Sequence, residues 1–411
     1  MYRRNIEPLI HAALLDTPVV LLNGARQTGK TTLVQKVASE LSLRYVTLDD
    51  ATILSAAATD PQGFIRGLGQ KAVIDEVQKV PSLFPAIKLE VDSNRQPGRF
   101  LLTGSANVLM LPRMSESLAG RLEIISLMPL SQGELRDKDE MFIELLFSPI
   151  LDTPSLADKY EADSFLSELI VKGGFPEIQK RISDKRRQTW FSSYITTILQ
   201  RDVRDLSNID GLIDMPRLLS LLASRIGGLL NASELSRSAG IPNSTLKRYI
   251  ALLEATFLYQ PRPAWSVNLG KRIIKSPKIQ MVDSGLVCHL AGYDARRLDE
   301  DATFRGHALE CFVAAELQKQ ISWSEMNVSV YHYRAVTGQK VDVVLENSQG
   351  RLVTIEVKSS ASVSKKDFRG IESFAETVGK RFLRGVVLYA GNQAVTFGND
   401  LYAMPISVLW Q

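Results

Sequence analysis

The chain has 411 residues, 45% of them hydrophobic and 23% charged, which excludes a disordered chain and, at roughly 150 residues per domain, predicts two to three domains. Forty-nine Lys and Arg against 45 Asp and Glu leave a formal net charge of only +4, so any nucleic-acid contact must come from local basic patches. Two cysteines exclude a disulfide framework. Glu7 and His11 soon follow the first basic residues, and no run of 18 apolar residues occurs, so we expect a soluble, unexported cytoplasmic protein without a membrane partner.

Short apolar runs alternate with helical segments over residues 1–140. The runs that are typical of buried strands lie at residues 19–22, 45–48, 72–74, 100–102 and 122–125. Strands that alternate with helices form parallel sheets, so we expect an α/β domain with a parallel sheet here.

A glycine-containing loop follows the first of these strands and precedes a helix expected over residues 31–41. Its spacing matches the phosphate-binding loop, in which glycines let backbone amides approach phosphates and the helix N-terminus adds positive potential. We expect Lys30 to reach the β and γ phosphates of ATP, and Thr31 to coordinate Mg²⁺. The nucleotide-binding residues predicted here are Gly24, Ala25, Arg26, Gln27, Thr28, Gly29, Lys30, Thr31 and Thr32.

The third apolar run ends in two adjacent carboxylates, Asp75 and Glu76. At the end of a buried strand, Asp75 is expected to hold the Mg²⁺, and Glu76 to polarise the attacking water as general base. The fourth run ends in Thr103, Gly104 and Ser105, whose hydroxyls are candidates for sensing the γ-phosphate. A simple turn at the strand end explains these hydroxyls nearly as well.

This order of elements resembles the AAA+ class of P-loop ATPases. The resemblance implies ATP hydrolysis, and a homo-oligomer in which an arginine of one subunit reaches the γ-phosphate of its neighbour. Arg121 is the leading candidate for that catalytic arginine and Arg113 the second, although either residue is equally explained as a solvated surface charge.

The middle of the chain is expected to be helical, with a lid over residues 155–215 and a winged-helix domain over residues 216–295. Residues 232–239, the turn from Gly240 to Asn243 and a helix capped by Ser244 form a helix-turn-helix pattern, and residues 261–278 fit a hairpin wing. Such domains bind DNA or serve as spacers between proteins, and both interpretations stay open. The basic side chains assigned to DNA are Lys247, Arg248, Lys271 and Arg272, with Arg262, Lys275 and Lys278 beside them.

Residues 300–411 are expected to form a compact α/β domain. Asp342 lies on one apolar strand, Glu356 and Lys358 lie on the next, and a short turn makes the two strands hairpin neighbours. Glu310 comes from the helix before them. Carboxylates in this arrangement bind Mg²⁺ or Mn²⁺ beside a scissile phosphate, with Lys358 orienting the attacking water, so all four residues are candidate catalytic residues and Asp342 and Glu356 candidate metal ligands.

This pattern resembles the PD-(D/E)xK nuclease superfamily, and implies a restriction-endonuclease-like fold for this tail. A salt-bridge cluster, or an inactive remnant of the fold, is the alternative.

The whole chain resembles the AAA-like ATPases that carry a C-terminal domain of unknown function, DUF4143. The motifs behind this resemblance are the phosphate loop, residues 75–78, 103–105, 118–121, 173–177 and 201–203, and the sequence Glu356-Val357-Lys358. The resemblance implies an ATPase with a nuclease-like tail that acts on DNA. Our leading hypothesis is an ATP-hydrolysing, DNA-processing or defence-related protein in which nucleotide state controls the metal-dependent tail. Residues 173–177 are expected to pack the lid, and Arg201 or Arg204 to contact phosphate or a neighbouring subunit. The alternative is a nucleotide-gated binding switch whose tail is a catalytically inactive scaffold.

Overall fold

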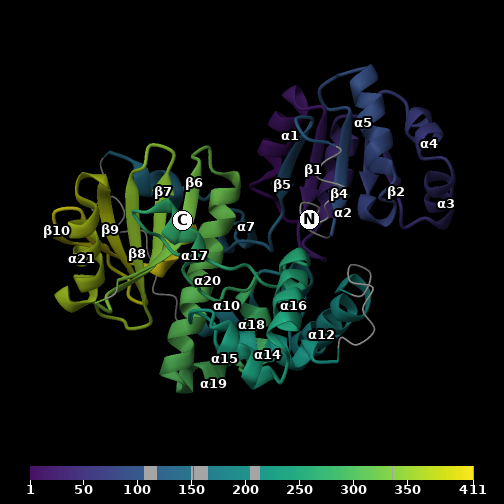
Figure 1. Cartoon of the computed structure of the whole chain (residues 1–411). Coiled ribbons are helices and arrows are strands. Elements are labelled where there is room, and N and C mark those ends of the chain that lie inside the picture. The colour runs from purple at the N-terminus through teal and green to yellow at the C-terminus, as the bar shows by residue number, and fades with distance from the viewer. Residues whose placement is uncertain (106–117, 150, 152–164, 204–212, 336, 411) are drawn as a thin grey trace.

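The computed structural model describes residues 1–105, 118–149, 151, 165–203, 213–335 and 337–410. An N-terminal sheet domain and a C-terminal sheet domain lie apart, and a group of helices joins them (Figure 1). Among the described residues, no helix combines the length and the hydropathy that are needed to cross a bilayer.

The N-terminal domain is a parallel sheet with strand order β2-β3-β4-β1-β5. Side chains of β1 alternate between two cores: Val19 and Leu21 pack on one face of the sheet, and Val20 and Leu22 on the other. Burial on both faces explains why its central strands are continuous apolar runs. The elements are α1 Glu7–Asp16, β1 Val19–Asn23, α2 Lys30–Glu40, β2 Arg44–Thr47, α3 Ala51–Thr59, α4 Pro61–Gly67, β3 Ala72–Asp75, η1 Val77–Lys79, α5 Leu83–Ser93, β4 Phe100–Gly104 and β5 Leu122–Ser126.

The described part of the middle region is helical, as its sequence predicts. Its elements are α7 Gln132–Leu135, α8 Phe142–Phe147, α10 Leu166–Lys172, α11 Pro176–Gln179, α12 Asp184–Thr197, η3 Ile198–Val203, α14 Met215–Ser224, α15 Ala232–Ala239, α16 Asn243–Ala255, α17 Leu269–Ile274, α18 Ser284–Ala291 and α19 Ala295–Glu300. Helices α15 and α16 form the predicted helix-turn-helix pair, and Gly240 ends α15 with a φ of 71°.

Two details of the predicted winged helix are wrong. Helix α16 starts at Asn243, and its N-terminus has no side-chain cap, so Ser244 does not cap it. The predicted wing contains helix α17 where a hairpin strand was expected, and isolated bridges such as Arg262 with Lys278 are its only antiparallel pairing among the described residues.

The C-terminal domain is a mixed sheet with strand order β10-β11-β9-β8-β7-β6. Strands β6, β7 and β8 form an antiparallel meander, and β9 pairs in parallel with β8 after the crossover helix α21. The elements are α20 Ala302–Trp323, β6 Val328–Arg334, β7 Lys340–Asn347, β8 Leu352–Lys358, η4 Lys365–Phe368, α21 Arg369–Val378, η5 Gly379–Arg381, β9 Phe382–Tyr389, β10 Val395–Gly398, β11 Leu401–Pro405 and η6 Ile406–Trp410.

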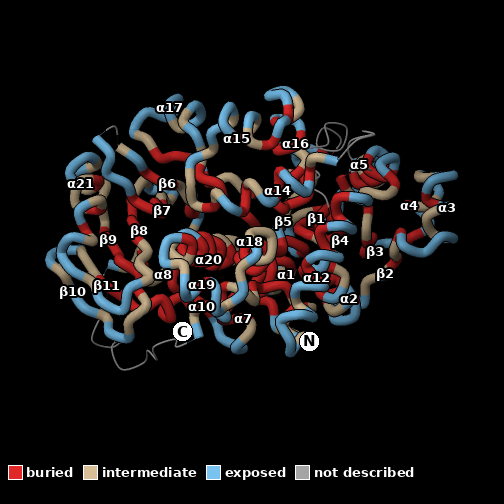
Figure 2. Tube along the Cα trace, turned by 90° about the horizontal axis from the view of Figure 1, so that it is seen from below, coloured by how far each residue is buried: buried red, intermediate tan, exposed pale blue. Residues whose placement is uncertain are grey.

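One hydrophobic core joins the middle helices to the C-terminal sheet. It runs from Phe142 in α8, through α14 and α18, to Ile355 in β8 and Trp410 near the C-terminus. Helix α20 lies at its centre and is buried along much of its length (Figure 2). The lid and the winged helix, predicted as separate domains, share this core with the tail.

Candidate functional site

The phosphate loop is held between β1 and α2 by backbone conformations that favour glycine. Gly29 has a φ of 97° just before α2, and Gly24 has a φ of 143°. A Cβ atom on Gly24 would lie 2.2 Å from the carbonyl oxygen of Leu127, so no larger residue fits there without moving the backbone. The loop conformation therefore depends on these two glycines.

Lys30 is buried at the first position of α2. Its Nζ donates to the carbonyl oxygens of Gly24 at 2.9 Å and of Ala25 at 2.8 Å, so the ammonium lies inside the loop. Burial lowers the pKa of Lys30 to about 8. A cation held in this position is placed to meet phosphate oxygens.

Several hydroxyl groups donate hydrogen bonds to Asp75 at the end of β3. It is buried, and it accepts from Thr31 Oγ1 at 3.0 Å and from Tyr45 Oη at 2.9 Å, while Thr103 Oγ1 also donates to it. The Thr31 hydroxyl at the start of α2 is thus in contact with the Asp75 carboxylate at the end of β3. A hydroxyl and a carboxylate are the ligands that Mg²⁺ takes beside nucleotide phosphates.

Glu76 follows directly in a left-handed conformation, with a φ of 61°. Its backbone amide donates to Thr103 Oγ1 at 2.9 Å, and Gln78 bonds both to the Glu76 carboxylate and to Ser105 Oγ, the latter at 3.0 Å. The strand-tip hydroxyls Thr103 and Ser105 therefore fix the orientation of Glu76. Gln78, which lies three residues after Asp75, was not among the predicted site residues.

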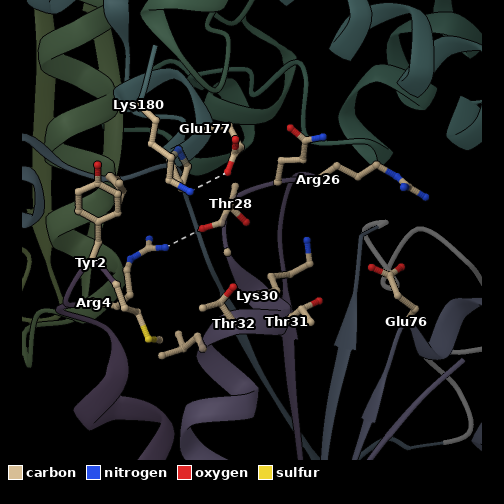
Figure 3. A pocket seen from close by; sticks show the side chains of 16 residues that line it. Tyr2, Arg4, Arg26, Thr28, Lys30, Thr31, Thr32, Glu76, Glu177 and Lys180 are labelled. Atoms are coloured by element: carbon tan, nitrogen blue, oxygen red, sulfur yellow. Dashed lines mark hydrogen bonds and ion pairs between the residues drawn. The ribbon is translucent and has the colours of Figure 1, made fainter. Parts of the chain in front are cut away.

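A pocket of about 750 Å³ opens over the loop (Figure 3). Arg26, Gln27, Thr28, Gly29, Lys30, Thr31, Thr32 and Glu76 line one side. Tyr2 and Arg4 line it from the N-terminus, and Pro176, Glu177 and Lys180 from the middle region. Gly24, Ala25, Asp75, Thr103 and Ser105 support these residues from behind, through the contacts described above.

Arg26 of the loop is paired across the domain boundary with Asp202 at the end of η3. Burial raises the pKa of Asp202 against the opposing effect of Arg26. The Tyr194 hydroxyl also donates to the carbonyl oxygen of Arg26, at 3.4 Å. Asp202 lies in the motif 201–203, but nothing in the sequence indicates which residue it contacts.

Arg121 and the phosphate loop of its own chain lie at opposite ends of strand β1. Its carbonyl oxygen accepts from the amide of Val19 at the start of β1, whereas the loop follows the end of that strand. Its guanidinium is bonded to Asp92. Arg121 therefore contributes nothing to the phosphate loop of its own chain, and its role in a neighbouring subunit stays a prediction. Arg113 and Arg204 lie outside the described residues.

The basic residues predicted to contact DNA do not form a single surface. Lys247, Arg248 and Lys271 are exposed. Arg272 instead binds Glu346 at 2.6 Å and lies over the ring of Trp265. For the three exposed residues, a contact with DNA stays a prediction. Arg272 instead forms an ion pair that links the middle region to the tail.

The predicted tail residues converge, but two cations of the wing join them. Arg262 and Lys278, expected at the DNA surface, are buried beside Glu310. Glu310 Oε1 accepts from Arg262 Nη2 at 2.5 Å and from Lys278 Nζ at 2.7 Å, and Lys278 Nζ also donates to Asp342 Oδ1 at 3.1 Å. Burial alone would raise the pKa of Asp342, but Lys278 and Lys340 hold it below its ordinary value.

Glu356 and Lys358 complete the cluster from β8. The pair Val343 with Ile355 sets the register, which places Asp342 opposite Glu356. Glu356 Oε1 accepts from Lys358 Nζ at 3.0 Å, while Glu356 Oε2 is buried without a hydrogen-bond partner. Burial and the neighbouring Asp342 raise the pKa of Glu356 to about 7. In this structure the ammonium of Lys278 lies between the carboxylates of Glu310 and Asp342, so the oxygens that face it are already bonded.

Comparison with protein families divides the chain into three matched parts. Residues 16–136 match an AAA domain, residues 164–297 match the domain of unknown function DUF8612, and residues 305–409 match DUF4143. The AAA and DUF4143 parts of the resemblance drawn from the sequence are thereby confirmed.

Among solved structures, the Walker-type ATPase paby2304 of Pyrococcus abyssi is matched at 14% identity over 71% of this chain and 96% of that one, with a TM-score of 0.40. Among curated proteins, the uncharacterized protein Rv2008c of Mycobacterium tuberculosis is 33% identical over 98% of this chain and 83% of its own length. An uncharacterized protein of Haemophilus influenzae is 25% identical, over 67% of this chain and 70% of its own length. The chain therefore belongs to the family of the mycobacterial protein, and it joins an AAA domain of the P-loop ATPases to a C-terminal DUF4143 domain.

Proposed function

We propose that the protein is an ATP-driven switch that binds DNA. The observation that carries this proposal is the composition of the nucleotide pocket, in which the phosphate loop faces Pro176, Glu177 and Lys180 of the middle region. A nucleotide in this pocket would touch both domains, so that its binding and hydrolysis change how the domains meet.

The residues around the loop have the arrangement that hydrolysis requires. Lys30 would neutralise the β and γ phosphates, and Thr31 with Asp75 would hold the Mg²⁺ that accompanies ATP and screens the phosphate charge. Glu76, held by Thr103 and Gln78, would orient and polarise the attacking water. Its left-handed backbone conformation is of the strained kind often found at functional positions.

DNA is proposed as the partner because α16 is the second helix of a helix-turn-helix pair and exposes Lys247 and Arg248. A helix in this position fits the major groove, where basic side chains contact bases and phosphates. Lys271, exposed on α17, would add a phosphate contact.

The test measures ATP turnover and DNA binding on the same preparations. Lys30→Ala is expected to lose nucleotide binding, and Glu76→Gln to bind ATP but hydrolyse it at least a hundredfold more slowly. Fluorescence anisotropy with a labelled duplex should show affinity that changes with nucleotide and falls steeply with salt. Lys247→Ala should weaken DNA binding without changing basal ATP turnover. Tight nucleotide binding by Lys30→Ala would contradict the proposed pocket. A DNA affinity that is the same with and without nucleotide would contradict the proposed switch.

A second candidate adds DNA cleavage by the tail. The observation in its favour is that Glu310, Asp342, Glu356 and Lys358 come together from α20, β7 and β8. Plasmid, linear, single-stranded and branched DNA would be incubated with Mg²⁺ or Mn²⁺, with and without ATP. Cleavage that Asp342→Ala removes while ATP turnover persists would establish this activity. DNA binding and ATP turnover without cleavage would leave the switch with an inactive scaffold.

A further inference from the structure

The phosphate loop carries a second cation in addition to Lys30. Arg26 lines the nucleotide pocket, and its Nε donates to Oδ2 of Asp202, an acid of η3 in the middle region. The side chain of Arg26 is 23% exposed and that of Asp202 is 10% exposed. Guanidinium groups bind carboxylate and phosphate in the same way, so the Asp202 carboxylate occupies a position that phosphate oxygens can take.

The guanidinium of Arg26 lies at the end of the pocket where hydrolysis is proposed to occur. Figure 3 shows it on the same side of Lys30 as Glu76, whereas Tyr2 lies on the other side. Burial disfavours the charge of Arg26, but Asp202 and Glu76 hold the pKa of the guanidinium above its ordinary value, so Glu76 is close enough to act on it. Since Glu76 is proposed to polarise the attacking water, the γ-phosphate of ATP would lie at this end.

We propose that Arg26 is the catalytic arginine of this ATPase, that ATP draws its guanidinium from Asp202 to the γ-phosphate, and that Asp202 is its partner while the pocket holds no ATP. This inference rests on the proposed ATPase function of the pocket. It gives to a residue of the same chain the role that the resemblance to AAA+ proteins gives to an arginine of a neighbouring subunit.

Hydrolysis moves negative charge onto oxygens that Arg26 would contact. The water oxygen forms a bond to the γ-phosphorus, and the bond from that phosphorus to the oxygen shared with the β-phosphate breaks, with its electron pair staying on ADP. Glu76 accepts one proton of the water and then passes it to the products, ADP and inorganic phosphate. A guanidinium beside the γ-phosphate and the leaving oxygen neutralises the charge that develops there.

A γ-phosphate is a better partner for Arg26 than Asp202 is. Burial raises the pKa of Asp202 against the effect of Arg26, and the charge of Glu76 raises it further, so the ionised carboxylate is disfavoured where it lies. A γ-phosphate has more charge and more acceptor oxygens than one carboxylate, and a guanidinium has five N–H donors to meet them. ATP therefore displaces Asp202, whereas ADP, which lacks the γ-phosphate, leaves the pair intact.

The exchange of partners also changes how the loop meets the middle region. Asp202 lies in η3, which continues α12, and Tyr194 of α12 donates to the carbonyl oxygen of Arg26 at 3.4 Å. Two contacts thus join the loop to the same helical unit. When the Arg26 side chain turns to ATP, the first contact is lost while the backbone contact stays, so η3 responds to the γ-phosphate.

The experiment measures ATP turnover and nucleotide binding by the full-length protein, with Mg²⁺ and without DNA. Wild type, Arg26→Ala, Arg26→Lys, Asp202→Asn and the double variant Arg26→Ala with Asp202→Asn are compared. Binding is followed by isothermal titration with ADP, and with ADP plus aluminium fluoride, which mimics the γ-phosphoryl group in the transition state. Arg186→Ala is the control for the loss of one positive charge, because Arg186 is exposed on α12.

Arg26→Ala and Arg26→Lys are expected to lower kcat by about a hundredfold or more. Both should bind ADP as tightly as wild type, yet lose the gain in affinity that aluminium fluoride provides. Asp202→Asn should keep kcat at or above the wild-type value and lower KM for ATP, because Arg26 then leaves no carboxylate. The double variant should be as slow as Arg26→Ala, and Arg186→Ala should match wild type.

A purely structural role for the ion pair predicts a different result. If Arg26 only fastens the loop to η3, Asp202→Asn would slow turnover as much as Arg26→Ala does, and that result would overturn the inference. Equal kcat values for wild type and Arg26→Ala would overturn it too. Where Arg26→Ala fails to fold because Asp202 is left buried and unpaired, the double variant decides, and turnover at the wild-type rate contradicts the inference.

The same measurements separate this inference from the proposed function. Wild-type turnover that Lys30→Ala removes and Arg26→Ala does not would leave the ATPase standing and overturn only the role of Arg26. Wild type that binds ATP without hydrolysing it would leave the nucleotide pocket and overturn the catalytic role. Wild type that binds no ATP would overturn both. Because DNA is absent, a failure to bind DNA has no bearing on the result.

Discussion

Arg4 donates through Nη1 to the carbonyl oxygen of Thr28 at 2.7 Å, which ties the N-terminal segment directly to the phosphate loop. The same buried guanidinium donates to the carbonyl oxygen of Met128 at 2.7 Å and to Glu134 at 3.0 Å. Lys319 of α20 in turn donates to the carbonyl oxygen of Leu130, at 2.9 Å. A short run of contacts thus links the loop to the central helix of the tail.

Replacing Arg4 by Met should weaken ATP binding several-fold and destabilise the protein by about 3 kcal/mol. Glu134 would become an unpaired buried charge and two carbonyl oxygens would lose their donors, which is costly inside a protein. Isothermal titration with ATP and urea denaturation would measure the two effects. Arg3→Met is the matched control, because Arg3 pairs with Asp139 at an exposed position. Equal effects of the two substitutions would refute the role given to Arg4.

Stability should fall as pH rises because of Glu140. Burial and the nearby Glu316 raise the pKa of Glu140 from 4.5 to about 8. Between these values the native carboxyl keeps its proton while the unfolded chain has released it, so the contribution to stability is complete below pH 4.5 and lost as pH rises through 8. The free energy of unfolding should decrease by up to about 1.4 kcal/mol per pH unit in this window. Urea denaturation from pH 5 to 9 would show this slope in wild type and a flatter one in Glu140→Gln.

Gly173→Ala should destabilise the protein by at least about 2 kcal/mol. Gly173 ends α10 with a φ of 64°, and an added Cβ atom would lie 2.2 Å from Asp283 Oδ1. Asp283 is buried and accepts from the amide of Gly174 at 2.6 Å, so it has little room to move. Gly306→Ala, in open space on α20, should instead stabilise by up to about 1 kcal/mol through helix propensity. Thermal unfolding of both variants tests the contrast.

Neither cysteine should react with thiol reagents in the folded protein. Cys288 and Cys311 are buried, and burial raises the pKa of Cys311 to about 12, so almost no thiolate forms at neutral pH. Ellman's reagent should label both thiols rapidly in urea and neither in buffer. Labelling in buffer at the same rate as in urea would show that the core around α18 and α20 opens easily.

The strands of the N-terminal sheet, the two strands that carry Asp342 and Glu356, and the phosphate loop could be predicted because their signals are local. Buried strands give continuous apolar runs, and a loop that must approach phosphates needs glycines at fixed spacing. The placement of Asp342 opposite Glu356 also followed from a short turn and strand alternation. These features depend on residues close in sequence.

The contacts that cross domains could not be predicted. Arg262 and Lys278 have the composition of a basic DNA-binding wing, and nothing in the sequence indicates that the chain turns them inward onto Glu310. Arg4 is separated from Thr28 by a helix and a strand, and the partner of Arg26 is Asp202. Only the packing of the three matched parts decides which of these charges is buried.

The single core shared by the middle helices and the tail has a consequence for how the molecule melts. Residues that pack in one continuous core lose their contacts together, so calorimetry should resolve two transitions, one for the N-terminal sheet domain and a larger one for everything after it. A fragment cut near residue 300 would expose apolar surface on both sides of the cut and aggregate. If ATP binds in the proposed pocket, mainly to the first unit, it should raise the melting temperature of that unit more than that of the other. The difference between the two increases measures how strongly the bound nucleotide couples the two units.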